Sequence, residues 1–538
     1  MGSGSLLSPR NGLLFAVIVA ALAYLLIDPS SRRPEIVLRQ GKVRGVTLER
    51  GDFAQQVEAF YRIPYAQPPV GELRFKRAQP VPDSNTTVYD SQTYGPRCPG
   101  KQLLAVPGAS DDSEDCLTAN IFRPANTSGQ LMPVAVYFHG GAFNRGTAKI
   151  HDTASMVSHA AQPIVAVSFN YRLGALGFLN SAATAREGIL NLGLWDQVLL
   201  LSWVQDNIRA FGGNPDDVTV MGLSAGAHSI GHHLLNGKSV FHKAITESGG
   251  ATSRALHPPD SQLHEEQYQL FLDELNCTTV QCLRELPSSA VTAASSKVFD
   301  AYNHFVRWAW QPVIDNELVP GRTLDQNWPK NIAVITGFNH NEGTMYVPKD
   351  MSTPAQFDTF FQTLLPHVTE RVAALYPQEE YIEWRPDRGE QYMRVEAAYG
   401  QYAYACPARQ AAGKLGTSVF LYHWALNQTV AGGANHGDQM WYEAMDPTVR
   451  GISEHQDRLA RTFHGYITDF IATGNPNGGG RPEWADFGTS RKTMVFGLGN
   501  DERAGGTGVG NGPASLLKDD WAMKQCEFWE RWSRVYED

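Results

Sequence analysis

The sequence contains no run of basic residues, no internal repeat and, after residue 35, no low-complexity tract or long linker rich in proline and serine. Nucleic-acid binding needs clustered lysine and arginine, and the formal net charge here is −10, so no nucleic-acid partner is expected. The six cysteines form no Cys-x-x-Cys pair and have no histidine pairs nearby, which argues against a zinc site.

The N-terminus differs sharply in composition from the rest. Residues 13–27 are all apolar, with Arg10 before them and a polar segment that includes Arg32 and Arg33 after them. As a helix this run would span roughly 22 Å, less than the ~30 Å hydrocarbon layer of a bilayer. It predicts a signal peptide cleaved after Ala21-Leu22-Ala23, or an uncleaved signal anchor that tethers the protein to a membrane. Because apolar residues continue to Ile27, the anchor is favoured, and either alternative predicts entry into the secretory pathway.

Cysteine number and glycosylation sequons also indicate an oxidising compartment. The cysteine count is even. Proximity in the sequence favours Cys98 with Cys116 and Cys277 with Cys282, which leaves Cys406 and Cys526, although six cysteines allow fifteen pairings. Four Asn-x-Ser/Thr sequons predict glycosylation at Asn85, Asn126, Asn276 and Asn427.

Short apolar runs alternate with helix-like stretches such as Leu194–Ile208. This alternation predicts an α/β fold whose mostly parallel sheet is covered by helices on both faces. We expect one large domain over residues 35–538, preceded by the segment 1–34. The expected strands are Pro133–Phe138, Ile164–Phe169, Val218–Met221, Lys243–Thr246, Ile332–Thr336 and Ser418–Trp424.

A serine lies in a Gly-x-Ser-x-Gly turn between an expected strand and an expected helix. Residues 218–226 read Val-Thr-Val-Met-Gly-Leu-Ser-Ala-Gly, and the following stretch to Leu235 is helical in character. This strand–turn–helix context is what a nucleophile elbow needs, because the tight turn requires small flanking residues such as Gly222 and Gly226. Ser224 is therefore the predicted nucleophile.

A serine nucleophile needs a base and a group that orients the base, in the chain order nucleophile, acid, histidine. Glu342 follows the expected strand Ile332–Thr336, and His436 lies in a glycine-containing loop after the strand Ser418–Trp424. These positions favour Glu342 as the acid and His436 as the general base. Among the 16 histidines, nearby candidates are His340, His423, His464 and the pair His232–His233.

Backbone amides must also stabilise the oxyanion that forms when a serine attacks a carbonyl. His139-Gly140-Gly141-Ala142 directly follows the expected strand Pro133–Phe138. We expect the N–H groups of Gly140 and Gly141, together with that of Ala225, to form the oxyanion hole.

These motifs resemble the type-B carboxylesterase/lipase family of α/β-hydrolases, which includes the cholinesterases and fungal lipases. The resemblance runs from about residue 36 to the C-terminus and implies the triad, the oxyanion hole and the three cysteine pairs named above. It implies no metal or organic cofactor. Further matching segments are Ile63-Pro64-Tyr65-Ala66, Glu114-Asp115-Cys116-Leu117, Asn170-Tyr171-Arg172-Leu173-Gly174, Phe211-Gly212-Gly213-Asn214-Pro215, Thr473-Gly474-Asn475-Pro476-Asn477 and Cys526-Glu527-Phe528-Trp529.

Two departures from the family pattern bear on the substrate. Many relatives have glutamate where this chain has Leu223, and the loop between Cys98 and Cys116 contains no tryptophan. A cationic choline ester is therefore not expected. We expect a serine esterase that acts on a small uncharged ester through an acyl-enzyme. The alternatives are an acyltransferase or tailoring esterase on a natural product, and a non-catalytic adhesion domain. The sequence does not reveal whether Trp308, Trp310 or Trp441 lines the site.

Overall fold

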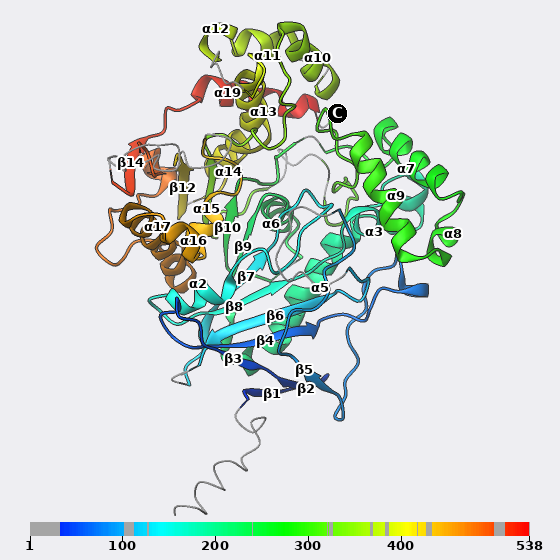
Figure 1. The fold of residues 1–538 in the computed structure, drawn as a ribbon, viewed down its shortest axis with the longest axis vertical. Coiled ribbons are helices and arrows are strands. Elements are labelled where there is room, and N and C mark those ends of the chain that lie inside the picture. The colour runs from blue at the N-terminus through cyan, green and yellow to red at the C-terminus, as the bar shows by residue number, and fades with distance from the viewer. Residues whose placement is uncertain are drawn as a thin grey trace, which may run out of the picture.

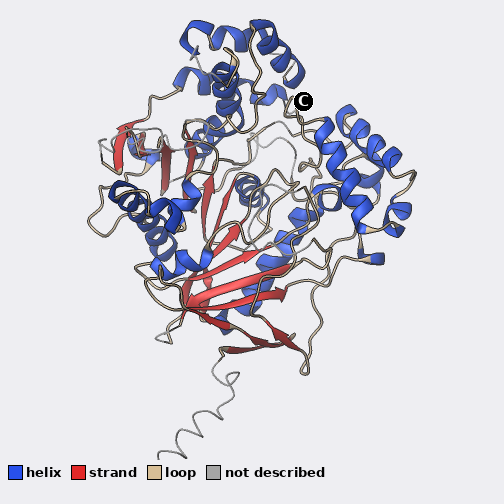
Figure 2. Ribbon diagram, viewed as in Figure 1, coloured by secondary structure: helices blue, strands red, loops and turns tan. Residues whose placement is uncertain are grey.

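The apolar runs of the sequence form one large sheet with helices on both sides (Figures 1 and 2). A computed structural model describes residues 33–101, 112–125, 129–238, 240–254, 256–319, 321, 327–365, 369–381, 387–416, 418–426, 433–499 and 512–536. The sheet has 11 strands in the order β14-β13-β12-β11-β10-β9-β7-β8-β6-β4-β3, and a separate three-stranded sheet has the order β1-β2-β5.

The middle of the large sheet is parallel and its margins are antiparallel. Every neighbouring pair from β8 across to β13 is parallel, whereas β6, β4, β3 and β14 pair antiparallel. The predicted α/β fold is confirmed. The strands are β1 (Glu35–Leu38), β2 (Gly41–Arg44), β3 (Val46–Leu48), β4 (Val57–Pro64), β5 (Val88–Asp90), β6 (Thr118–Pro124), β7 (Met132–Phe138), β8 (Val165–Phe169), β9 (Gly213–Leu223), β10 (Lys243–Glu247), β11 (Ala333–Asn339), β12 (Val419–Trp424), β13 (Lys492–Phe496) and β14 (Ala514–Lys518).

The six predicted strands correspond to β7 through β12, with two notable differences in length. Strand β9 begins at Gly213, five residues before the predicted start, and β11 continues to Asn339 rather than ending at Thr336. Apolar periodicity missed both extensions because they contain polar residues and glycines. The longer β11 places Glu342 three residues beyond the end of its strand.

The helices fall into groups around the sheet. Figure 1 shows α7, α8 and α9 together on the right and α10, α11 and α12 at the top. They are α2 (Thr153–His159), α3 (Gly174–Gly177), α4 (Ala182–Arg186), α5 (Leu192–Asn207), α6 (Ala225–Asn236), α7 (Gln262–Glu274), α8 (Val280–Glu285), α9 (Ser288–Ala301), α10 (Pro354–Leu364), α11 (Thr369–Leu375), α12 (Gln378–Tyr381), α13 (Tyr392–Gly400), α14 (Cys406–Lys414), α15 (Gln439–Glu443), α16 (Pro447–Arg450), α17 (Glu454–Thr473), α18 (Phe487–Ser490) and α19 (Met523–Tyr536), with 3₁₀ turns η2 (Gly71–Leu73) and η3 (Ile208–Phe211) and the π-helix η5 (Gln401–Ala405).

Side chains of each central strand alternate between two apolar cores, one on each face of the sheet. In β7, Val134 and Val136 pack into one core and Ala135 and Tyr137 into the other. Since successive side chains of a strand point to opposite faces, a strand buried on both faces reads as a continuous apolar run. Helices α5 and α6 cover the first face, and α2 and α17 cover the second.

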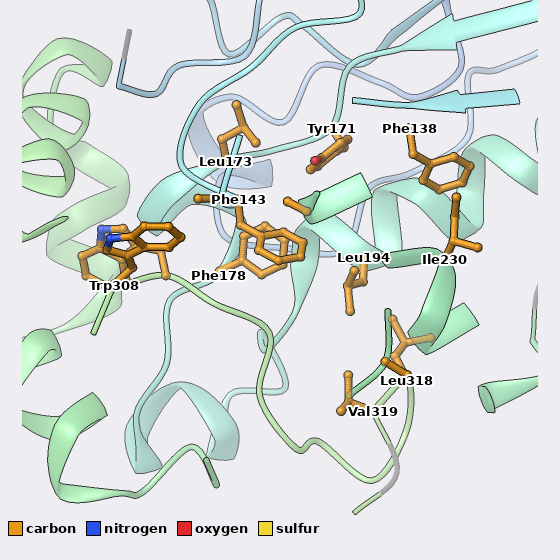
Figure 3. Close-up of a cluster of buried hydrophobic side chains, with 14 of the residues drawn as sticks. Phe138, Phe143, Tyr171, Leu173, Phe178, Leu194, Ile230, Trp308, Leu318 and Val319 are labelled. Atoms are coloured by element: carbon orange, nitrogen blue, oxygen red, sulfur yellow. The ribbon is translucent and has the colours of Figure 1, made fainter. Parts of the chain in front are cut away.

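Figure 3 shows part of the first core, where Phe143 and Phe178 are in contact. Their ring centroids are 4.9 Å apart, and the rings cross at 62°. In the same view, Phe138 at the end of β7 lies beside Ile230 of α6. This packing holds α6 against the ends of the central strands, where the candidate nucleophile lies.

The cysteines are joined in pairs, Cys98 to Cys116, Cys277 to Cys282 and Cys406 to Cys526. Of the sequon asparagines, Asn85 and Asn276 are exposed, whereas Asn126 and Asn427 lie outside the described residues. The apolar segment 13–27 also lies outside them. No helix among the residues that the structure does describe has the length and apolar character needed to cross a bilayer.

Candidate active site

Ser224 occupies the sharp turn between β9 and α6. Its backbone has φ 58° and ψ −121°, a conformation that side-chain-bearing residues rarely adopt. The surrounding backbone holds it there: Ser224 N–H donates to the carbonyl of Glu247 at 2.9 Å, and its carbonyl accepts from His228 N–H at 2.8 Å. The turn therefore keeps Ser224 in a strained position that the neighbouring strand β10 stabilises.

The two glycines of the Gly-x-Ser-x-Gly motif are needed because the turn packs directly against the end of β7. A Cβ atom on Gly222 would lie 2.7 Å from the carbonyl oxygen of Phe138, and one on Gly226 would lie 2.0 Å from the same atom. No side chain fits at either position without displacing the strand. The motif is thus explained by close backbone contact on both sides of the serine.

Glu342 and His436 meet at the ends of β11 and β12. Nδ1 of His436 lies 2.5 Å from Oε2 of Glu342, and the other carboxylate oxygen accepts from Asn339 N–H at 2.6 Å. Both side chains are buried, with exposed fractions of 6% for His436 and 1% for Glu342. A carboxylate on Nδ1 fixes the ring orientation and leaves Nε2 to act as the base.

The loops that carry these two residues are joined by hydrogen bonds. Asn341 N–H donates to Ala434 O at 2.9 Å, and Ala434 N–H donates to Asn341 Oδ1 at 3.1 Å. Asn339 Nδ2 donates to the Asn435 carbonyl beside them. The relative position of acid and histidine is therefore set by one backbone hydrogen bond and two that involve asparagine side chains, and does not depend on their own contact alone.

Nε2 of His436 is buried and has no hydrogen-bond partner in the described part of the chain, Ser224 included. The histidine loop nevertheless lies next to the elbow, since a Cβ atom on Gly437 would be 3.1 Å from Cδ2 of Leu223. Catalytic hydrogen bonds are often long in ligand-free enzymes and shorten when substrate binds. The arrangement leaves this nitrogen free to take a proton.

The glycine loop after β7 lies against the elbow from the other side. A Cβ atom on Gly140 would be 3.1 Å from Cβ of Ser224, and Gly141 has φ 118°. Ala225 is the first residue of α6, where an N–H has no partner within the helix. None of these three N–H groups donates a hydrogen bond to another described residue.

The competing histidines are engaged elsewhere. Nδ1 of His340 and Nε2 of His423 are 3.0 Å apart, and His233 Nε2 contacts Gln197 Oε1 at 2.8 Å. His464 Nδ1 donates to the Glu443 carbonyl at 2.8 Å. The structure thus brings together Glu342 and His436, whereas His340, His423, His233 and His464 are engaged with other residues.

Sequence reasoning missed an aromatic wall beside the histidine. The ring of Tyr404 lies 4.4 Å from that of His436, and the ring of Tyr346 lies 5.2 Å from it. Tyr346 also contacts Trp308 at 5.2 Å. Tyr404 belongs to the π-helix η5, a form of helix that often marks functional sites. The sequence did not predict the position of these tyrosines, because the spacing of apolar residues does not reveal a single π-helical turn.

Two glutamates are buried behind the elbow without a cationic partner. Glu247 at the end of β10 and Glu443 of α15 are both fully buried, and their carboxyl groups lie against each other. Burial raises the pKa of Glu443 to about 7 and that of Glu247 well above its usual range. The adjacent His151 is uncharged at neutral pH, since burial lowers its pKa to about 4.

Comparison with known proteins identifies the family. A carboxylesterase family model matches residues 32–529. The chain belongs to the carboxylesterase family. It is 32% identical to secreted lipase 4 of Gibberella zeae, over 91% of each chain, and 30% identical to carboxylesterase 1C of Mus musculus, over 88% of this chain and 91% of the relative.

Solved structures agree with this assignment. The fold is similar to that of Aspergillus niger EstA, with a TM-score of 0.79, 26% identity and coverage of 94% of this chain and 100% of EstA. As a carboxylesterase, the protein is a carboxylic ester hydrolase. Within the described residues, no group of three or more histidine, cysteine, aspartate or glutamate side chains is placed to hold a metal ion.

Proposed function

We propose that this carboxylesterase hydrolyses its ester through an acyl-enzyme on Ser224. The observation that carries the proposal is the Glu342–His436 contact of 2.5 Å, with Nε2 of the same ring unpartnered in a loop packed against the elbow. A buried carboxylate on Nδ1 stabilises the imidazolium that forms when Nε2 takes a proton. Ser224, Glu342 and His436 together have the chemistry of a serine hydrolase triad.

In the first step, His436 Nε2 removes the proton of the Ser224 hydroxyl as its oxygen attacks the ester carbonyl. The negative charge that develops on the carbonyl oxygen is stabilised by the unpaired N–H groups of Gly140, Gly141 and Ala225, each contributing about 3–4 kcal/mol in the transition state. His436 then protonates the leaving alkoxide. Water activated by the same histidine hydrolyses the acyl-enzyme and restores the serine.

Replacing the nucleophile tests the mechanism directly. Ser224→Ala is expected to lower kcat by about a millionfold, because the remaining groups act only through the serine. Thermal unfolding of the variant should match that of the parent within a few degrees, and an organophosphonate probe should label the parent only. Undiminished ester turnover in this variant would remove Ser224 from the mechanism.

Leu223, which stands where many relatives have glutamate, bears on the choice of substrate. No acidic side chain stands beside the nucleophile there, so the site has no local attraction for a cationic alcohol. We infer hydrolysis of non-cationic esters, with water as the acceptor. An acyltransferase would instead form new esters or amides when alcohols or amines are added, and the ratio of acid to transfer product measures which acceptor is used.

We also propose that residues 35–538 act as one catalytic domain delivered through the secretory pathway. The relative from Gibberella zeae is named a secreted lipase, the cysteines are paired in disulfides, and two sequon asparagines are exposed. Mass spectrometry of the mature N-terminus, with and without glycosidase treatment, distinguishes a cleaved signal peptide from a retained anchor. An unglycosylated protein with reduced cysteines would contradict the proposal.

A further inference from the structure

A small pocket beside the aromatic wall contains cationic side chains and no acidic ones. It has a volume of about 70 Å³ and is lined by Arg254, Arg307, His257 and His264 together with apolar and aromatic residues. No aspartate or glutamate is among the described residues that line it. Burial lowers the pKa of both histidines, that of His264 to about 4, so the arginines supply the charge at neutral pH.

The guanidinium of Arg254 has no carboxylate partner among the described residues. Its Nη2 donates to the hydroxyls of Tyr404 at 2.9 Å and Tyr399 at 3.1 Å, and Nη1 lies 3.5 Å from Oε1 of Gln311. The group is stacked on Trp308, 3.8 Å from the ring centroid. Its Nε is buried and has no hydrogen-bond partner in the described part of the chain. The side chain is thus held rigidly while its charge stays uncompensated.

Other buried arginines of the molecule are neutralised or saturated. Arg74 pairs with Glu114 and Arg172 with Asp196, each at 2.6 Å. Arg394 has no carboxylate partner among the described residues but donates from all three nitrogens, to two backbone carbonyls and to Gln391. A largely buried cation normally needs such partners, because removing a charge from water costs several kcal/mol when nothing compensates it. Arg145 and Arg254 each have a buried Nε without a partner among the described residues, and Arg254 lines the pocket described above.

Two side chains link Arg254 and the pocket wall to the proposed catalytic groups. The ring of Tyr404, which accepts a hydrogen bond from Arg254, also lies 4.4 Å from that of His436, tilted by 46°. Gln311 of the pocket wall donates to the carbonyl of Ala142 at 3.0 Å, in the loop that carries the unpaired amides. Arg254 is thus one side chain removed from His436 and from the loop of Gly140 and Gly141, so a substrate whose ester lies at Ser224 could place a second group at Arg254.

From this geometry we propose that the enzyme prefers esters that carry a carboxylate, bound by Arg254 in this pocket at a distance from the scissile bond. The inference rests on the proposed function and names its substrate class. It revises the expectation of an uncharged ester. That expectation followed from Leu223, and the absence of an acidic side chain there argues only against a cationic substrate. Arginine in a water-poor site forms strong charge-assisted hydrogen bonds with carboxylates, and the free Nε adds a donor.

Paired substrates that differ only in charge test the preference. Monophenyl adipate is compared with its terminal amide to place the anion on the acyl side, and 4-carboxyphenyl butyrate with 4-carbamoylphenyl butyrate to place it on the alcohol side. The parent enzyme is expected to have a kcat/KM about tenfold or more higher for the acid than for the amide in one pair. Equal kcat/KM values in both pairs would overturn the proposal.

Variants assign the preference to Arg254. Arg254→Gln is expected to lower kcat/KM for the favoured acid by about 10- to 100-fold, and that for the amide by no more than about twofold. Arg254→Lys should recover part of the loss. Arg77→Gln is the matched control, since Arg77 also stacks on a tryptophan at 3.8 Å but lies at the surface. If Arg254→Gln lowered both substrates equally, the residue would have a structural role only.

A binding measurement separates this proposal from the catalytic one. Adipate titrated calorimetrically into the Ser224→Ala variant should bind saturably, and the Ser224→Ala/Arg254→Gln double variant should bind it at least tenfold more weakly. If the parent enzyme hydrolyses no ester but adipate binds in this way, the proposed function is wrong and the proposal of an anion-binding pocket is supported. If esters are hydrolysed but adipate binding does not depend on Arg254, the pocket proposal fails alone.

Discussion

Two regions near the proposed catalytic groups bury charges of opposite sign in different ways. In one region Arg254 lines a cavity and faces tyrosine hydroxyls. In the other region Glu247 and Glu443 are fully enclosed, and His151 beside them is uncharged at neutral pH. An arginine cannot shed its proton within the ordinary pH range, whereas an enclosed carboxyl can keep one.

The comparison shows why only one of these regions suits ligand binding. The arginine retains its charge and has an opening through which an anion can reach it. The glutamates reduce their cost of burial by remaining protonated, as their raised pKa values indicate. A buried arginine without a carboxylate partner next to a cavity indicates a site for an anionic ligand. A buried carboxyl that no ligand can reach instead makes the stability of the fold depend on pH.

The largest effect is expected where a buried carboxylate must stay charged. Glu342→Gln should lower kcat by about 10⁴-fold, because an amide no longer holds the correct tautomer of His436 or supports its charge. Steady-state ester hydrolysis measures the loss. Glu443→Gln is the matched control and should change kcat by less than about threefold at pH 7. Equal losses of kcat in the two variants would show that Glu443, like Glu342, takes part in catalysis.

The next effect concerns stability and pH. Because the pKa of Glu443 is raised from 4.5 to about 7, its contribution to stability is complete below about pH 4.5 and is lost as the pH rises towards 7. Glu443→Gln should therefore be more stable than the parent at pH 8 and about equal to it near pH 4.5. Urea unfolding at the two pH values measures the difference.

An exposed glutamate provides the opposite trend as a control. Arg77 lowers the pKa of Glu317, so this carboxyl stabilises the fold above pH 4.5 and loses its contribution as the pH falls. Glu317→Gln should consequently lose slightly more stability at pH 8 than near pH 4. A Glu443 variant that followed this same direction would contradict the raised pKa.

The smallest expected effect comes from adding a carboxylate to the pocket lined by Arg254. Gln311→Glu places a carboxylate next to Nη1 of Arg254, where the present amide oxygen is 3.5 Å away. The preference for acid over amide esters should fall about tenfold, since the new carboxylate competes with that of the substrate. Gln311→Met removes the same donor to Ala142 without adding charge, and should keep the preference. Parallel kcat/KM ratios for the two variants would show that the charge is irrelevant.

The sequence predicted those parts of the molecule that local chemistry defines. Continuous apolar runs identified β7 through β12 because a strand covered on both faces has no polar side. The turn at Ser224 was predictable because it requires glycine at positions 222 and 226, where a Cβ atom would clash with the carbonyl oxygen of Phe138. The candidates Glu342 and His436 followed from their places just beyond strand ends, and the structure brings them into contact.

The remaining features depend on tertiary contacts that no short pattern records. Arg254, Trp308 and Tyr399 come from three irregular or distant segments, and Arg254 has φ 77°, which sequence reasoning gives no cause to expect. Glu247 follows an apolar run just as Glu342 does, so only the structure distinguishes the enclosed carboxyl from the one that reaches a histidine. Antiparallel margins such as β4 were missed because a register shift between Phe60 and Ile63 interrupts the alternation.

The bond between Cys406 and Cys526 has a consequence for how the enzyme is made. Cys406 directly follows the π-helix that carries Tyr404, and its partner lies in α19, twelve residues before the last one in the chain. The disulfide beside the aromatic wall can therefore form only after the 120 residues from Cys406 to Cys526 have been synthesised. A nascent chain arrested before α19 would carry Ser224, Glu342 and His436 yet lack this disulfide, so full activity should require α19 and a compartment in which thiols are oxidised.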